Sequence, residues 1–297
     1  MGERKRFMKK KYKAIFFDWD GTAVLSRKAP VEEIVQAMAP LLDQKVNLVI
    51  VSGTTIENIA GGKLAEYFTK EQLKYLYLGL GRGAFNYRYD NGQELVFSHM
   101  LPDQKLLGDI HRICFEIHME LLERYGLNTD IVFSRPNYCK IDLMVENQRG
   151  DNLFMQENEL DMLKDCLKKH GVAGGLQGLL DISVAAGEKY GVEVKPTCDA
   201  KYLEVGISSK SDNVDHILEY LQKEQKISAS DCSFWGDEYV GIEEGIFGSD
   251  SFMKTKETEA GDFFDVSEVP GKRPDGVKML GGGVDRFLEF LRKQAEN

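Results

Sequence analysis

Cysteine is scarce in this chain, and long apolar segments are missing. The 5 cysteines are odd in number, widely spaced and free of any CxxC pair. This argues against a disulfide framework or a zinc site and predicts reduced thiols in a cytoplasmic protein. No apolar run reaches the ~18 residues that a membrane span needs, so we expect no membrane partner. Near the N-terminus the apolar run covers only residues 14–17, which is too short for a signal peptide, so we expect none.

An excess of positive charge is also missing. The chain has 38 Lys and Arg against 48 Asp and Glu, a net charge of −10. It therefore lacks the basic footprint of a nucleic-acid binder, and we predict no nucleic-acid partner. A composition of 42% hydrophobic and 29% charged residues over 297 residues is typical of an ordered globular protein with about two domains. The sequence carries no signal of an oligomeric state.

Short apolar runs alternate with helical patterns at both ends of the chain, which is typical of a parallel sheet. The runs and patterns predict N-terminal strands at 13–17, 47–51 and 75–78, with helical segments at 31–42 and 56–68. Beyond the middle of the chain they predict strands at 202–207, 231–235, 251–253 and 263–266, with helices at 212–222 and 287–292. We therefore predict an α/β fold with a Rossmann-like parallel-sheet core made from residues 1–82 and 203–297.

The middle of the chain has a different pattern. Asn91-Gly92 lies between two strand-like runs, which is a strong signal of a hairpin. The patterns predict helices at about 103–125 and 157–169, and strands around 131–133, 140–145, 180–185 and 192–194. We expect residues 83–202 to form an α+β cap domain inserted into the core.

Polar side chains follow the ends of the predicted core strands: Asp18 and Asp20, Ser52, Lys210 and Asp237. In open α/β sheets, ligands bind outside the carboxyl ends of the strands. Two carboxylates two residues apart point to the same side of an extended chain. One can attack an electrophile such as phosphorus while the other moves a proton. A cation must offset the charge repulsion, and Mg²⁺ with oxygen ligands fits.

In these motifs the chain resembles phosphatases of the haloacid dehalogenase superfamily, specifically the Cof-like members with a class IIB cap. The first family motif, DxDGT, is present as residues 18–22, the second as Ser52, the third as Lys210 and the fourth as Gly236-Asp237-Glu238. The resemblance implies Mg²⁺-dependent hydrolysis of a small phosphomonoester, and we expect a sugar phosphate. Asp18 would be the nucleophile that forms an aspartyl-phosphate, and Asp20 the acid and then the base.

The resemblance also implies which residues bind phosphate and metal. Phosphate contacts would come from Gly21, Thr22, Ser52, Gly53 and Lys210. The Mg²⁺ ion would be held by Asp18, the main-chain carbonyl of Asp20, and Asp237.

Two departures from the family pattern affect the predicted site. Many relatives have a second acid four residues after the first in motif four, and Gly241 occupies that position here. We expect Glu238 to complete the metal site, with Glu243, Glu244 and Asp250 as alternatives. At the entrance to the insert, Arg82-Gly83 replaces the common Asn-Gly, and a guanidinium there could bind a second anionic or hydroxyl group of the substrate. Arg135 and Lys140 of the insert are further candidates for substrate contact.

Other functions stay open at this point. A phosphosugar mutase of the same fold would retain the phosphoryl group instead of transferring it to water. A non-catalytic sensor of a phosphorylated ligand would result if the Gly241 departure abolished metal binding. Residues 79–84 match a dinucleotide-binding GxGxxA, but that motif must open a helix and here it opens a hairpin. We therefore expect no dinucleotide cofactor.

Overall fold

The computed structural model describes residues 10–145, 159–199 and 201–296, which divide into two compact units. Unit 1 consists of Met1–His99, Lys210–Gly241 and Asp250–Asn297, and unit 2 of Met100–Ser209 and Ile242–Ser249. Within the described ranges, no helix is both long enough and apolar enough to cross a lipid bilayer.

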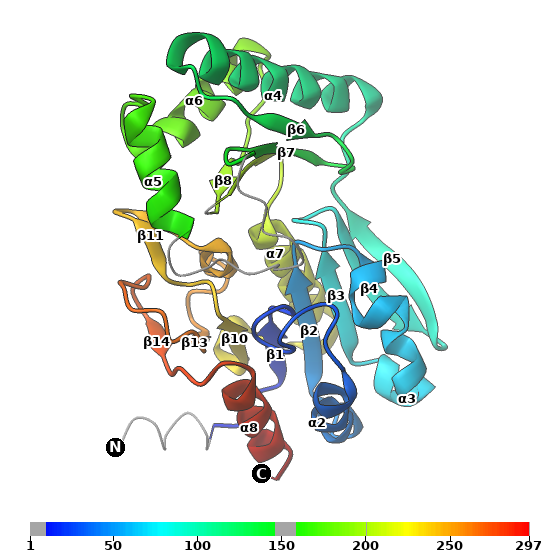
Figure 1. Cartoon of the computed structure of the whole chain (residues 1–297). Helices are drawn as coiled ribbons and strands as arrows, with labels where there is room; N and C mark the ends of the chain where they lie inside the picture. Colours follow the sequence, from blue (N-terminus) through cyan, green and yellow to red (C-terminus); the bar gives the residue numbers. More distant parts are fainter. Residues whose placement is uncertain (1–9, 146–158, 200, 297) are drawn as a thin grey trace. The chain divides into compact units, whose positions relative to one another are not determined.

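An eight-stranded sheet forms the centre of unit 1 (Figure 1). Its strand order is β14-β13-β10-β1-β2-β3-β4-β5. The pairs from β14 to β3 are parallel, and the β3–β4 and β4–β5 pairs are antiparallel. The strands span β1 Ala14–Phe17, β2 Asn47–Ser52, β3 Leu76–Leu80, β4 Phe85–Asp90, β5 Gln93–His99, β10 Cys232–Gly236, β13 Asp262–Asp265 and β14 Val277–Met279.

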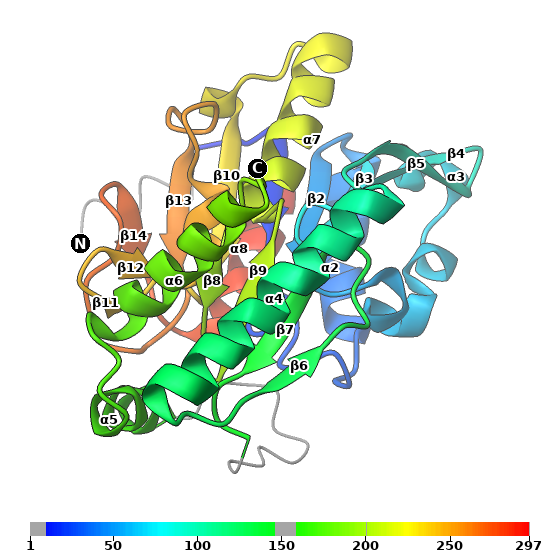
Figure 2. The same ribbon diagram turned by 90° about the horizontal axis from the view of Figure 1, so that it is seen from above.

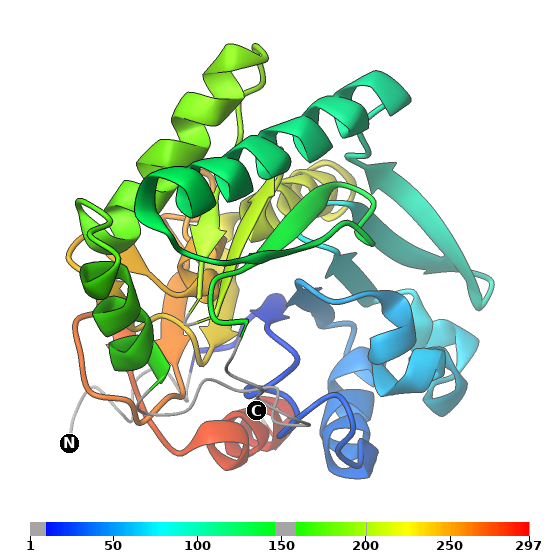
Figure 3. The same cartoon turned by 45° about the horizontal axis from the view of Figure 1, so that its top comes forward.

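Helices cover both faces of this sheet because its central strands are apolar on both faces. Helices α2 (Glu32–Asp43) and α8 (Gly283–Glu296) pack side by side on one face (Figure 3). On the other face, α7 (Lys210–Gln225) packs against the side chains of β1, β2 and β3. Unit 1 also contains the short helix α3 and several 3-10 turns, among them η1 to η4; these elements span α3 Lys70–Leu73, η1 Ile56–Asn58, η2 Ala60–Gly62, η3 Leu64–Tyr67 and η4 Ala229–Asp231.

The alternation of side chains along β1 sends Phe17 to the α2/α8 layer and Phe16 to the α7 layer. Phe17 lies 4.9 Å from the Phe287 ring of α8, and Phe16 stacks on Phe234 at 4.8 Å. Each fully buried phenylalanine contributes about 1.5–3 kcal/mol of hydrophobic free energy. This packing fixes the position of the residue that follows β1, which is Asp18.

Unit 2 is built on a four-stranded antiparallel sheet in the order β6-β7-β9-β8. Helices α4 and α6 contact one another and the strands of this sheet (Figure 2). Helix α4 begins where the Asp103 carboxylate accepts a hydrogen bond from the Leu106 N–H and ends at the left-handed Gly126. The elements span β6 Asp130–Val132, β7 Tyr138–Asp142, β8 Thr197–Cys198, β9 Tyr202–Gly206, α4 Gln104–Tyr125, α5 Glu159–Lys169 and α6 Gly175–Lys189. Farther along the chain follow the paired strands β11 and β12 and the turn η5, which span β11 Gly241–Glu243, β12 Ile246–Phe247 and η5 Ser249–Met253.

The mostly parallel sheet with helices on both faces confirms the predicted α/β class. The boundaries between the two units differ from the predicted ones, which lay after residue 82 and after residue 202. Residues 83–99 extend the central sheet instead of belonging to the insert, because β4 pairs antiparallel with β3. Residues 203–209 belong to unit 2 instead of the core, because β9 pairs with β7. Residues 242–249 also belong to unit 2.

Several predicted elements are of a different type. Residues 180–185, expected as a strand, lie in α6, whose buried side chains recur at helical spacing: Leu176, Leu179, Ser183 and Ala186. A run of apolar residues does not by itself distinguish the two structures. Residues 251–253 form the 3-10 turn η5, residues 192–194 form no strand, and residues 56–68 form 3-10 turns instead of an α-helix. The helix expected from 157 begins at Glu159, and residues 157 and 158 lie outside the described part.

Candidate active site

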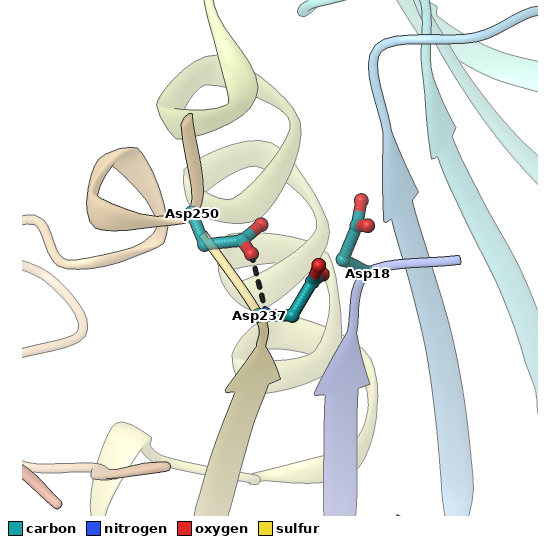
Figure 4. Close-up of side chains that lie close together, drawn as sticks. All are labelled: Asp18, Asp237 and Asp250. Atoms are coloured by element: carbon teal, nitrogen blue, oxygen red, sulfur yellow. Dashed lines mark hydrogen bonds between the residues drawn. The ribbon is translucent and has the colours of Figure 1, made fainter. Parts of the chain in front are cut away.

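Two neighbouring parallel strands bring Asp18 and Asp237 together. Asp18 follows β1 and Asp237 follows β10, and Phe17 is in register with Trp235. The Asp18 N–H donates to the Trp235 carbonyl at 2.9 Å, so the strand pairing continues up to the carboxylate itself. Figure 4 shows the two side chains at adjacent strand ends.

A third carboxylate, that of Asp250, completes this group. One carboxylate oxygen from each of Asp18, Asp237 and Asp250 lies within 4.8 Å of the others. Asp250 comes from η5, and its Oδ2 accepts hydrogen bonds from the main-chain N–H groups of Asp237 at 2.9 Å and Glu238 at 2.8 Å (Figure 4 marks the bond to Asp237). A Cβ atom on Gly236 would lie 2.2 Å from Asp250 Oδ2, so only glycine leaves room for this carboxylate.

Lys210 joins the group from the first residue of α7. Its Nζ donates to Asp18 Oδ1 and to Asp250 Oδ1, both at 2.8 Å, and the ammonium is buried. Burial alone would lower the pKa of Lys210, but the charges of Asp18 and Asp250 raise it well above its usual value. Lys210 was expected after a core strand; it follows a strand of the unit 2 sheet, and α7 of unit 1 positions it.

The carboxylates outnumber the ammonium. Burial and, to a smaller extent, the charge of Asp250 raise the pKa of Asp18 to about 8, even though Lys210 acts in the opposite direction. Burial and the charge of Asp250 also raise the pKa of Asp237 well above its usual value. Two buried carboxylates and the half-buried one of Asp237, when all three are ionised, leave a surplus of negative charge beside one ammonium, and a divalent cation would balance it. Carboxylate oxygens are the ligands that Mg²⁺ prefers, so this donor set fits the predicted metal.

Glu238, expected to complete the metal site, is exposed and does not belong to the three-carboxylate group found among the described residues. Asp250, one of the alternatives, lies in its place. Of the other two, Glu243 accepts hydrogen bonds from the N–H groups of Leu176 and Gln177 at the start of α6, and Glu244 is exposed. Asp250 is separated from Asp237 by 13 positions, a spacing that the family pattern did not indicate.

The turn after Asp18 is fitted to Asp237. Gly21 has a φ of +85°, and a Cβ atom there would lie 2.2 Å from Asp237 Oδ2. Thr22 is fully buried and its hydroxyl donates to Asp237 Oδ1 at 3.0 Å. We expected Gly21 and Thr22 to bind phosphate. In the structure Thr22 holds the Asp237 carboxylate by a hydrogen bond, and Gly21 leaves room for it.

Asp20 has a partner that the sequence interpretation missed. Arg27 donates to Asp20 Oδ2 at 3.0 Å. Burial raises the pKa of Asp20, and Arg27 opposes this shift. Only the presence of a basic residue seven positions after Asp20 could have indicated the pair, and such a residue is common in any loop.

Ser52, Gly53 and Arg82 lie together near the ends of β2 and β3. Ser52 is the last residue of β2, and its Oγ accepts the Thr54 N–H at 3.3 Å. Arg82 is buried with a φ of +54°, and its Cγ would be 3.6 Å from a Cβ atom on Gly53. The structure therefore places Arg82 beside the predicted phosphate-binding residues, in a turn of unit 1.

Asn213, which the sequence interpretation also missed, connects this turn to α7. Its Oδ1 accepts the Gly83 N–H at 2.7 Å, and its Nδ2 donates to Phe85 O at 3.1 Å and to Asn86 Oδ1 at 2.9 Å. Asn213 is fully buried one helical turn after Lys210. The same side chain therefore fixes both the Arg82 turn and the start of the helix that carries Lys210.

The two predicted substrate contacts in unit 2 lie on or near its sheet. Lys140 on β7 pairs with Glu204 of β9 at 2.8 Å and lies 4.9 Å from the centre of the Tyr202 ring. Arg135 precedes β7 and is partly buried, with no hydrogen-bond partner for its Nε among the described residues. Substrate contact by Arg135 and Lys140 stays a prediction.

Comparison with known proteins identifies the fold. Neither a protein-family model nor a curated protein sequence matches the chain. Among solved structures, the N-terminally truncated, IMP-bound IMP-nucleotidase of Plasmodium falciparum is 14% identical with a TM-score of 0.60, over 98% of this chain and 70% of that one. A trehalose-6-phosphate phosphatase of Aspergillus fumigatus is 14% identical with a TM-score of 0.54, over 99% of this chain and 96% of that one. The C-terminal domain of the C. albicans trehalose-6-phosphate phosphatase is 13% identical with a TM-score of 0.58, over 98% and 95%.

The sheet and the carboxylates at the ends of its parallel strands define the molecule as an α/β protein, and the neighbours share its fold. More specifically, both kinds of neighbour are phosphatases of the haloacid dehalogenase superfamily, and this chain has the haloacid dehalogenase fold.

Proposed function

We propose that the protein is a Mg²⁺-dependent phosphatase that hydrolyses a small phosphomonoester, a sugar phosphate, through an aspartyl-phosphate. One observation carries this proposal: Asp18, Asp237 and Asp250 converge with Lys210 beside the carboxyl ends of β1 and β10. The fold shared with known phosphatases supports it further.

Asp18, Asp237 and Asp250 would hold the Mg²⁺ ion, together with the main-chain carbonyl of Asp20 that the family resemblance adds. Bound there, the ion would offset the repulsion between the carboxylates and the phosphate and would polarise a phosphoryl oxygen.

The residues of the chain supply the remaining chemistry in two steps. In the first, an Asp18 oxygen bonds to phosphorus, the bond to the leaving oxygen breaks, and Asp20 gives that oxygen a proton. In the second, the Asp20 carboxylate takes a proton from water, the water oxygen bonds to phosphorus, and the bond to Asp18 breaks. Lys210 and Ser52 would hold phosphate oxygens during both steps.

The proposed substrate class rests on the neighbours and on the site. The trehalose-6-phosphate phosphatases match over 95–96% of their own chains, whereas the IMP-nucleotidase matches over 70% of its chain. The match over nearly the whole length of these sugar-phosphate phosphatases is the ground for proposing a sugar phosphate. Arg82, beside Gly53, would bind a further hydroxyl or anionic group of the substrate. A small phosphorylated molecule as partner and a cytoplasmic location stay predictions.

The test measures release of inorganic phosphate from a panel of sugar phosphates, including trehalose 6-phosphate, and from IMP. Each ester is assayed with Mg²⁺ and with EDTA, using the wild type, Asp18→Asn and the control Asp90→Asn. Asp90 is the exposed last residue of β4 and pairs with Gln93 of β5, so its substitution removes a carboxylate without touching the site. We expect release that requires Mg²⁺ and Asp18 and does not require Asp90.

Two outcomes would contradict the proposal. Transfer of the phosphoryl group to another position of the sugar, without free phosphate, would favour a phosphosugar mutase. Binding of a phosphate ester by folded protein without turnover, with or without Mg²⁺, would favour a sensor.

A further inference from the structure

The proton transfers proposed above depend on Asp20, and its two carboxylate oxygens differ in their hydrogen bonding. Oδ2 accepts a hydrogen bond from the Arg27 guanidinium at 3.0 Å, and the Arg27 main chain also hydrogen-bonds to the carboxylate. Oδ1 is buried and has no hydrogen-bond partner among the described residues. Buried carboxylate oxygens nearly always accept a hydrogen bond, so Oδ1 is suited to a partner that arrives with the substrate.

The loop after β1 brings Arg27 back to Asp20. The Ala23 and Val24 N–H groups both donate to the Trp19 carbonyl at 3.0 Å, and the Gly21 N–H donates to the Val24 carbonyl at 2.7 Å. This tight turn spans residues 19–24 and so includes most of the DxDGT motif. The Arg27 guanidinium therefore approaches Asp20 from the loop. The side chain of Arg27 is 31% exposed, and that of Asp20 is 15% exposed.

The chemistry of the guanidinium decides which oxygen can carry a proton. Arginine has N–H donors and no acceptor. A proton on Asp20 Oδ2 would point at another donor, whereas a proton on Oδ1 meets no such conflict. The ion pair therefore assigns different roles to the two oxygens of the same carboxyl group.

We propose that Arg27 is a positioning residue for Asp20, which it holds through Oδ2 so that Oδ1 gives and takes the proton. This inference rests on the proposed phosphatase reaction. In the first step, the proton leaves Oδ1 for the ester oxygen while the electron pair of the breaking P–O bond moves to that oxygen and Asp18 bonds to phosphorus. In the second step, Oδ1 takes a proton from the attacking water.

The test compares two esters that differ in their need for a proton. p-Nitrophenyl phosphate releases an acidic phenol that leaves easily as an anion, whereas a sugar phosphate such as glucose 6-phosphate releases an alcohol that must be protonated. General acid catalysis contributes about 10²–10⁴-fold in rate. We expect Arg27→Met to lower kcat for the sugar ester by about 10²-fold, toward the lower end of that range. The same variant should lower kcat for the aryl ester only slightly, with KM little changed for both.

A double-mutant cycle separates positioning from structural support. Because Arg27 acts through Asp20, Arg27→Met in the Asp20→Asn background should cause no further loss on the sugar ester. Arg27→Lys keeps a donor and should recover part of the rate. The control is Arg292→Met, which removes an exposed arginine that pairs with Glu33 at 3.6 Å, and it should keep both activities.

Two results would overturn the inference while leaving the proposed function intact. One is an equal loss of kcat on both esters in an Arg27→Met protein whose circular dichroism and urea midpoint match the wild type. The other is a further large loss when Arg27→Met is added to Asp20→Asn. If the wild type releases phosphate from neither ester, the proposed function fails and the role of Arg27 fails with it.

Discussion

Replacing Lys210 by methionine tests the electrostatic account of the site. The substitution keeps an unbranched chain about as long as the apolar stem of lysine and removes the ammonium that lies 2.8 Å from both Asp18 and Asp250. Removing one partner of a buried ion pair costs about 3–5 kcal/mol, because the remaining charge is buried without compensation. In metal-free protein at pH 7, we expect Lys210→Met to lower the free energy of unfolding by about this amount.

The effect should depend on pH in a defined direction. The pKa of Asp18 is raised in the folded protein to about 8, so the folded state binds a proton more readily than the unfolded chain. Its contribution to stability is present at low pH and is lost as the pH rises through about 8. Without Lys210 this pKa rises further, so Asp18 adds little to the gap in unfolding free energy below about pH 7. The gap between wild type and Lys210→Met should widen as the pH rises through about 8, from pH 7 to pH 9. Saturating Mg²⁺ should narrow the gap, since the cation replaces part of the missing charge.

Urea unfolding followed by tryptophan fluorescence measures these differences. The chain has 2 tryptophans, Trp19 and Trp235, and both are fully buried in unit 1, so the signal reports on the unit that contains the site. The control Lys13→Met removes an exposed partner of Asp231 at 3.1 Å and should cost about 0–1 kcal/mol. A Lys210→Met protein as stable in EDTA as Lys13→Met, at both pH values, would refute the reasoning.

Three further predictions follow from the same geometry. Gly236→Ala places a Cβ atom 2.2 Å from Asp250 Oδ2 and should weaken Mg²⁺ binding roughly tenfold or more in calorimetric titration. The control is Gly108→Ala in α4, where a Cβ atom meets nothing within 4 Å. It should leave the Mg²⁺ affinity unchanged and raise the free energy of unfolding by up to about 1 kcal/mol. Equal Mg²⁺ affinities in the two variants would contradict the expected clash at Gly236. Asn213→Ala leaves the Gly83 N–H without its acceptor and should lower the free energy of unfolding by about 1–3 kcal/mol, and an unchanged urea midpoint would argue against it. Mg²⁺ at 100 times its Kd should stabilise the wild type by about 2.7 kcal/mol relative to EDTA, so a Tm that does not respond to Mg²⁺ would contradict a metal site.

The sequence predicted the parts of the site that depend on local patterns. Asp18 and Asp237 each follow a short apolar run, and such a run is recognisable without neighbours because a strand buried on both faces must be apolar throughout. Adjacent parallel strands then place the two carboxylates side by side. Both aspartates were identified for this reason.

Residues that reach the site from loops or turns were harder to predict. Asp250 lies in a 3-10 turn, 13 positions after the carboxylate that it joins, and its neighbours in sequence carry no periodic pattern. Arg27 and Asn213 likewise act through hydrogen bonds that no spacing rule describes. Strand membership was also ambiguous: 202–207 was correctly expected as a strand but assigned to the wrong sheet, because pairing partners are not encoded in the strand itself.

By itself, the sequence determined the α/β class, the alternation of strands and helices in the core, and the acidic motif after the first strand, because side-chain periodicity and turn chemistry act over a few residues. The tertiary structure decided which acid becomes the third carboxylate, which base pairs with Asp20, and which sheet each strand joins. These outcomes depend on contacts between residues far apart in the chain, such as Lys210 with Asp18 and Asp250, whose geometry is set only when the helices pack on the sheet.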